Sequence, residues 1–191
     1  IGFHSLKSIN DLCEKNKLKV FNVEIIESQG GTIRCYISKN ISKYKISKNI
    51  LKILKKEENS KLFDSRKLES FKFKIKNHSN SMNKLIKNLK KKKNKISVYG
   101  ASGKGQALMQ YCKIDNNLVD YVFDKSKLKQ NLYTPGTNIK IIDPKYIKKG
   151  IVDYLLILSW NLKKEIIKQE KGFLKKGGKF IIPFPTPQIL K

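Results

Sequence analysis

The fold of this chain can be worked out from Ile96-Ser97-Val98-Tyr99-Gly100-Ala101-Ser102-Gly103-Lys104-Gly105. The run from Ile96 to Tyr99 is short and mostly apolar, a glycine-dense loop follows it, and an amphipathic segment begins directly afterwards. This order predicts a strand, a tight turn and a helix, which together bring backbone N–H groups and a helix N-terminus to one point. Anionic groups, and phosphates above all, bind well at such a point.

Strands and helices continue to alternate behind this turn. The sequence predicts further strands at 118–123, 139–142, 153–159 and 179–182, and helices at 104–112 and from 160 or 161 to 171. Asp143-Pro144 should start another helix, because aspartate caps a helix and proline suits its first turn. The strand at 153–159 is almost fully apolar, as buried parallel strands are. We therefore expect residues 96–191 to form a Rossmann-like α/β domain, with a mostly parallel sheet and flanking helices.

Residues 1–40 predict a smaller unit of another kind. A helix at 5–15 is followed by strands at 18–26 and 32–37, joined by a glycine turn after Gln29. This is an antiparallel hairpin, and two strands do not make a stable domain alone. We expect 1–40 to be the tail of a domain whose other strands lie upstream of Ile1.

Residues 41–95 predict a helical linker that includes one long helix. Its apolar seam, spaced three and four residues apart, consists of Leu68, Phe71, Ile75, His78, Met82, Leu85 and Leu89. On such a seam, His78 is more often a packed or partly exposed residue than a catalytic base.

Composition narrows the function classes. The net charge is +27, but only two of the 42 basic residues are arginines and the lysines are spread over nearly the whole chain. This favours solvated surfaces over a specific nucleic-acid site, which relies on arginine forks and aromatic side chains. No apolar run approaches the roughly 20 residues of a membrane span. Three separated cysteines predict reduced thiols in a cytoplasmic protein, and two histidines leave no catalytic triad and no metal cluster.

The glycine loop matches neither standard phosphate-binding motif. A Walker loop needs serine or threonine after its lysine, whereas Gly105 follows Lys104, and the glycines lack GxGxxG spacing. Two interpretations remain: an anion site in which Ser102, Lys104 and backbone amides hold a diphosphate, or a tight turn that needs glycine for packing. Asp124 ends the next predicted strand, where a ribose-binding carboxylate is usually found.

Two further segments are expected at the same edge of the sheet. Trp160 and Asn161 follow a buried strand and offer a stacking face and an amide, although Trp160 could equally be a core residue. The segment 133–137 is either a ligand-covering loop or only a turn. The candidate substrate-binding residues are Gly100, Ala101, Ser102, Lys104, Gly105, Tyr133, Trp160 and Asn161.

Ordered motifs give the chain a family resemblance. They are Val-Tyr-Gly-Ala-Ser-Gly-Lys-Gly at 98–105, Asp-Tyr-Val-Phe-Asp-Lys at 120–125, Lys-Gln at 129–130, Tyr-Thr-Pro-Gly-Thr at 133–137, Ser-Trp-Asn-Leu-Lys-Lys-Glu-Ile at 159–166 and Phe-Ile-Ile-Pro-Phe-Pro at 180–185. In this order they resemble the C-terminal domain of the sugar C-methyltransferase family. Residues 1–37 resemble the end of that family's class I methyltransferase domain, where Gly30-Gly-Thr-Ile-Arg34 is similar to a Gly-Gly-Ser-Leu-Arg segment.

The resemblance implies a zinc-binding region, an S-adenosylmethionine-binding domain and this C-terminal domain, with a nucleotide-linked keto sugar between the last two. It also implies proton abstraction beside the keto group and attack of the enolate on the methyl group. The family's base is the histidine of a Glu-His pair that would precede Ile1, so His4 does not inherit that role. Gln29 stands where the family commonly has histidine, so a proton-transfer role of that position does not carry over. The resemblance implies that the catalytic residues and the zinc ligands lie upstream of Ile1.

Three hypotheses follow. The first is the C-terminal fragment of an S-adenosylmethionine-dependent C-methyltransferase, inactive alone, which supplies the nucleotide-sugar side of the active-site cleft. The second is a non-catalytic Rossmann-type module that binds NAD(P) or serves in assembly. Nucleic-acid binding is the third, and it predicts an affinity that falls steeply with salt.

Overall fold

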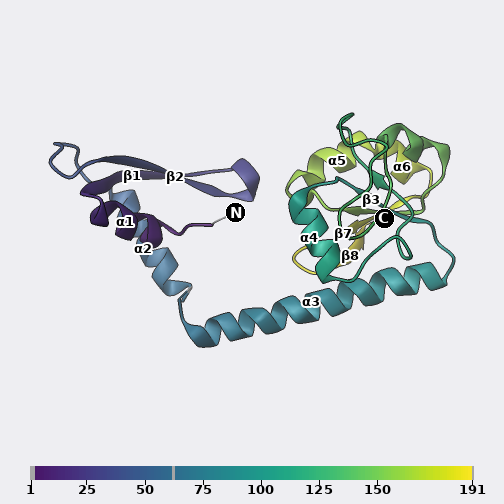
Figure 1. The fold of residues 1–191 in the computed structure, drawn as a ribbon, viewed down its shortest axis with the longest axis horizontal. Helices are drawn as coiled ribbons and strands as arrows, with labels where there is room; N and C mark the ends of the chain where they lie inside the picture. The colour runs from purple at the N-terminus through teal and green to yellow at the C-terminus, as the bar shows by residue number, and fades with distance from the viewer. Residues whose placement is uncertain (1–2, 62, 191) are drawn as a thin grey trace. The chain divides into compact units, whose positions relative to one another are not determined.

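The computed structural model describes residues 3–61 and 63–190, without the side chain of Gln29, and the chain divides into two compact units (Figure 1). The first unit is Ile1–Lys72 and the second is Phe73–Lys191. The division falls within helix α3 (Ser65–Lys91), inside the segment expected to be a helical linker. The domain boundaries predicted after residues 40 and 95 stay predictions.

The first unit is a two-stranded antiparallel sheet with two helices packed on it (Figure 1). Its elements are α1 (Leu6–Lys15), β1 (Leu18–Ile26), the 3-10 turn η1 (Ser28–Gly30), β2 (Thr32–Lys39) and α2 (Lys48–Asn59). The strands pair from Leu18 opposite Lys39 to Ile26 opposite Thr32, which confirms the predicted hairpin. Its small core consists of Leu6, Cys13, Val20, Val23 and Ile50.

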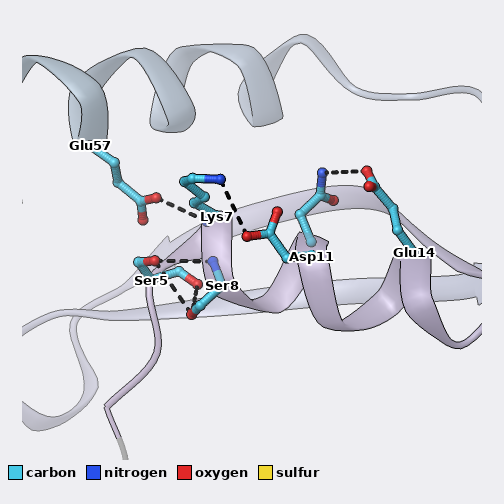
Figure 2. Close-up of polar contacts among 7 residues, drawn as sticks. Ser5, Lys7, Ser8, Asp11, Glu14 and Glu57 are labelled. Atoms are coloured by element: carbon cyan, nitrogen blue, oxygen red, sulfur yellow. Dashed lines mark hydrogen bonds and ion pairs between the residues drawn. The ribbon is translucent and has the colours of Figure 1, made fainter. Parts of the chain in front are cut away.

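The N-terminus of α1 is held by groups from two elements (Figure 2). The Oγ of Ser5 accepts a hydrogen bond from the backbone N–H of Ser8, so Ser5 caps the helix. Glu57 of α2 accepts hydrogen bonds from the backbone N–H groups of Leu6 at 2.6 Å and Lys7 at 3.0 Å. A carboxylate at this end satisfies orphan donors and complements the helix dipole, so Glu57 fixes α1 against α2.

The second unit contains a six-stranded sheet in the order β5-β4-β3-β6-β7-β8. The strands are β3 (Ile96–Tyr99), β4 (Val122–Phe123), β5 (Ile141–Ile142), β6 (Tyr154–Ile157), β7 (Lys179–Ile182) and β8 (Gln188–Leu190). The first five are parallel and β8 pairs antiparallel with β7. Counted from β3, this is the 3-2-1-4-5-6 order of a doubly wound fold, which confirms the predicted fold class.

Both faces of this sheet are buried. Val98 and Leu156 pack on one side with the second half of α3 and with α4 (Gly103–Tyr111). Leu155 and Ile157 pack on the other. That second face is covered by η2 (Pro144–Lys149), α5 (Lys163–Gln169) and α6 (Lys171–Lys175). Because neighbouring side chains of a strand point to opposite faces, a sheet covered on both sides requires apolar residues at successive positions.

Several predicted elements were too long or of the wrong type. The strand expected at 118–123 is only Val122–Phe123, because Leu118 and Val119 donate their backbone N–H groups to the Asp115 carbonyl in a turn. The strand expected at 139–142 is Ile141–Ile142. Asp143 does cap a helix, but this helix is the 3-10 element η2.

The C-terminal helices and strand also differ from expectation. The single helix expected up to residue 171 consists of the 3-10 turn η3 (Trp160–Leu162), α5 and α6. The edge strand β8 was not predicted, because three residues behind a proline-rich segment carry little strand signal.

The apolar seam of α3 is buried over only part of its length. Met82 and Leu89 are buried in the core of the second unit, whereas Leu68 and Phe71 are exposed. Ile86, which lies off the predicted seam, is fully buried. In the described part of the chain, no helix is both long enough and apolar enough to cross a membrane.

Candidate functional site

The candidate site lies where β3 and β6 end side by side in the middle of the sheet. The strand order reverses between these two neighbours, and ligands of doubly wound folds bind at such a switch point. Gly100 follows β3 with a φ of +98°, and a Cβ built on it would collide with the Oγ of Ser159. Both observations require glycine. The glycine loop and the segment 159–161 therefore meet at one place.

The loop leads directly into α4, and its residues serve two different purposes. Ser102 caps the helix, and its Oγ accepts a hydrogen bond of 3.1 Å from the backbone N–H of Gly105. A Cβ on Gly105 would lie 2.7 Å from the Cβ of Leu158, so this glycine permits close packing of α4 on the sheet. Gly103 and Lys104 are exposed in the first turn. Gly105 therefore serves the packing of α4 on the sheet. Ser102, Gly103 and Lys104 lie at the N-terminal end of α4, which favours anions.

Asp124 fixes the glycine loop from the neighbouring strand. Its Oδ2 accepts a hydrogen bond of 2.8 Å from the backbone N–H of Ala101, and its Oδ1 accepts one of 2.8 Å from Ser126. The Nζ of Lys129 lies 3.5 Å from Oδ2 and donates at 3.0 Å to the carbonyl oxygen of Ala101. Only 14% of the Asp124 side chain is exposed. Asp124 therefore organises the loop, and a ribose would have to compete for the same oxygens.

Lys129 is a site residue that sequence reasoning missed. It adds a second cation, beside Lys104, to the loop at the N-terminus of α4, and 46% of its side chain is exposed. The Lys-Gln pair at 129–130 was the sequence signal that could have identified Lys129. Both residues of the pair contact Asp124, since the Nε2 of Gln130 donates to the Asp124 carbonyl oxygen at 3.0 Å. One cation among 40 lysines could not be selected by composition alone.

Trp160 and Asn161 follow β6 in the short turn η3. Trp160 is partly buried, and its ring lies at 67° to that of Phe184 with the ring centroids 4.7 Å apart. Asn161 is exposed. Trp160 is therefore a rim residue whose ring is supported by Phe184.

The segment 133–137 packs against α4. The buried Oγ1 of Thr137 lies 2.7 Å from that of Thr134 and donates at 3.1 Å to the Oε1 of Gln106. Gln110 donates at 2.9 Å to the carbonyl oxygen of Pro135. Tyr133 itself forms a backbone bridge with Lys140, and 58% of the residue is exposed. Among the described residues, no hydrogen bond or ring contact joins the Tyr133 side chain to the loop 100–105.

Burial shifts the pKa of two titratable side chains near the sheet, Tyr99 and Glu170. Burial, followed by repulsion from Glu170, Asp124 and Glu165, raises the pKa of Tyr99 to about 12. The hydroxyl of Tyr99 has no hydrogen-bond partner among the described residues. Burial also raises the pKa of Glu170, and Lys148 and Lys125 oppose this shift. At neutral pH the Tyr99 hydroxyl therefore keeps its proton and does not act as a general base.

The first unit contains a cavity of about 810 Å³ between α1 and α2. Two of the acidic side chains in its lining are already engaged, because Glu57 accepts from the N-terminus of α1 and Asp11 pairs with Lys7. Within residues 3–61 and 63–190, no group of three or more histidine, cysteine or acidic residues could hold a metal ion.

Two comparisons with known proteins identify C-methyltransferases as relatives of this chain. A family model described as the C-methyltransferase C-terminal domain matches residues 27–185. The C-methyltransferase NovU of Streptomyces niveus is 28% identical over 189 residues, which cover 99% of this chain and 45% of that protein. The chain thus spans less than half the length of this curated relative. A solved structure, UDP-D-quinovosamine 4-dehydrogenase from Vibrio fischeri, is 20% identical with a TM-score of 0.36, covering 49% of this chain and 79% of that one.

Proposed function

The chain belongs to the family of C-methyltransferase C-terminal domains, and from this premise we propose that it forms the nucleotide-sugar side of the cleft in an S-adenosylmethionine-dependent C-methyltransferase. The observation that carries the proposal is the meeting of the glycine loop, Lys129 and Trp160 at the switch point. These groups suit the two ends of one ligand, because a diphosphate needs amides and cations whereas a base or sugar ring needs a flat apolar face.

The diphosphate is assigned to the N-terminus of α4. The first amides of a helix have no intrahelical acceptor, and the helix dipole favours negative charge there. Lys104 is on the first turn, and Lys129 is held at the loop by the Ala101 carbonyl oxygen. Trp160 would stack on the base or the sugar, and Asn161 would hydrogen-bond to it.

In the proposed reaction a base would remove a proton beside a keto group, and the resulting enolate would take the methyl group from the donor's sulfonium, whose sulfur would keep the electron pair of the broken bond as a neutral thioether. This chain would hold and orient the keto sugar, which lowers the barrier by fixing the reacting carbon. The methyl group would come from S-adenosylmethionine, to which no residue described here is assigned. Among its described residues, the first unit has two antiparallel strands and no parallel strand followed by a glycine loop. We likewise assign the base and the zinc ligands to other parts of the full-length protein.

A cytoplasmic location is part of the proposal. It is supported by the three free cysteines, since thiols stay reduced in that compartment.

The proposal is tested by titrating UDP-glucose, dTDP-glucose and NADH separately into this chain. Trp160 is the only tryptophan, so quenching of its fluorescence reports binding directly. Where Trp160 is replaced, calorimetry takes over as the readout. We expect a nucleotide sugar to bind, Trp160→Ala to weaken its binding about 5- to 100-fold through lost stacking, and Lys104→Ala and Lys129→Ala each to weaken it about tenfold.

The matched control is Lys175→Ala, since Lys175 is exposed on α6 and should not affect binding. Binding of NADH in place of nucleotide sugars would contradict the proposal and support the NAD(P) module. Nucleotide-sugar binding that is equally strong in all four variants would move the site away from the switch point.

A further inference from the structure

His78 of α3 contacts the segment that follows β7 in two ways. Its Nε2 lies 2.6 Å from the carbonyl oxygen of Pro183, a residue 105 positions further along the chain. Its ring is stacked on that of Phe184, with the ring centroids 4.7 Å apart and the planes 9° from parallel. One side chain therefore fixes both the backbone and the ring of Pro183-Phe184.

Phe184 in turn contacts the ring of Trp160. Their ring centroids are 4.7 Å apart at 67°, an edge-to-face arrangement typical of favourable aromatic pairs. The ring of Phe184 thus lies between two aromatic neighbours, stacked on His78 and tilted against Trp160. All three residues belong to the second unit, Phe73–Lys191.

We propose that His78 is a positioning residue, which holds Phe184 in place and thereby sets the orientation of Trp160 in the ligand site. The part of this inference that concerns ligand rests on the function proposed above. The part that concerns Trp160 rests on the contacts alone. Among the described residues, no hydrogen bond or ring contact joins His78 to the groups assigned to the ligand, so it acts through Phe184.

The hydrogen bond explains why a histidine is needed at this position. A carbonyl oxygen only accepts, so the Nε2 of His78 must carry the hydrogen. Pro183 is buried, and a buried carbonyl without a donor is unfavourable. An apolar side chain at position 78 would fill the seam of α3 but would supply no donor. We therefore expect the hydrogen bond, more than the ring stacking, to hold Pro183-Phe184.

Three variants of the full chain separate these contributions. His78→Phe keeps an aromatic ring and loses the donor, whereas His78→Gln keeps a donor and loses the ring. His4→Ala is the matched control, because His4 is the only other histidine and lies exposed in the first unit. The first readout is the emission maximum and steady-state anisotropy of Trp160 without ligand, which needs no assumption about function.

We expect His78→Phe to shift the emission of Trp160 to longer wavelength and to lower its anisotropy. His78→Gln should show a clearly smaller change, and His4→Ala none. The proposal is overturned if His78→Phe leaves both signals as in the wild type. It is also overturned if the phenylalanine and glutamine variants change the signals equally, since the donor would then not be the element that positions Phe184.

The second readout is the affinity for whichever nucleotide sugar, UDP-glucose or dTDP-glucose, binds the wild type. We expect His78→Phe to weaken it about three- to tenfold, a fraction of the loss expected for removing the stacking ring itself. Unchanged affinity together with a mobile Trp160 would overturn the role of His78 in the ligand site. If the wild type binds neither sugar, the proposed function fails, and the ligand-free fluorescence still decides whether His78 positions Trp160.

Discussion

The backbone N–H of Ala101 donates a 2.8 Å hydrogen bond to the Oδ2 of Asp124. This bond joins the loop after β3 to the residue after β4, 23 positions later. Because Ser126 and Lys129 use the same carboxylate, Asp124 is a structural anchor of the candidate site. The carboxylate that would bind a ribose in a dinucleotide site is thus already engaged within the protein.

Asp124→Asn should loosen the glycine loop. The amide has one acceptor oxygen and no charge, so it cannot serve Ala101, Ser126 and Lys129 together. We expect a loss of about 1–3 kcal/mol in the free energy of unfolding, measured by urea denaturation, and weaker nucleotide-sugar binding. Asp153→Asn is the control, since Asp153 accepts a 2.7 Å bond from the Lys95 N–H at the other end of β3. An Asp153 variant that weakens binding as strongly would contradict the assignment of Asp124.

Gly105→Ala should destabilise the second unit, because the new Cβ would lie 2.7 Å from that of Leu158. Overpacking of this kind costs about 1–3 kcal/mol in unfolding free energy. Gly103→Ala provides a matched control in the same turn, where no atom lies within 4 Å of the added Cβ. It should be neutral or stabilising by up to about 1 kcal/mol. Thermal unfolding followed by circular dichroism distinguishes the two, and equal melting temperatures would refute the packing role.

Met82→Ala and Phe71→Ala test how far the seam of α3 is buried. Met82 is fully buried, so its truncation should cost about 2–5 kcal/mol. Phe71 is 59% exposed, and its truncation should change the unfolding free energy by less than about 0.5 kcal/mol. Denaturant titration of both variants provides the comparison. A large loss for Phe71→Ala would show that a partner covers this part of the helix in solution.

Glu170 should make stability depend on pH. Burial raises its pKa above the ordinary value, with Lys148 and Lys125 opposing the shift. Between the ordinary and the raised pKa, the folded state binds more protons than the unfolded state, so the unfolding free energy falls as pH rises through that window.

Glu170→Gln should remove this dependence and leave the protein more stable than the wild type at neutral pH. Unfolding midpoints measured from pH 4 to pH 8 test it. The control is Glu165→Gln, on the exposed face of α5. If the unfolding midpoint of the wild type instead rose through this window relative to that of Glu170→Gln, folding would lower the pKa of Glu170, which would contradict the prediction.

Local pattern predicted much of this fold. The bounds of β1, β3 and β7 agree with the sequence, because a continuous or alternating apolar run between turn residues identifies a strand without help from its neighbours. The pattern overestimated β4 and β5, where turn hydrogen bonds from Leu118 and Thr134 compete for the backbone. Helix α3 was found, but its pattern did not show where it is covered, since burial depends on what packs against it.

The sequence by itself determined the strand–turn–helix at Gly100–Gly105, the parallel strands behind it and the family to which the chain belongs. Each follows from residues that are adjacent along the chain. Only the tertiary structure decided which of 40 lysines reaches the loop, that Asp124 is engaged within the protein, and that His78 supports Trp160 through Phe184. These contacts join residues far apart in sequence, and their partners are selected by the strand order and the packing of α3 on the sheet.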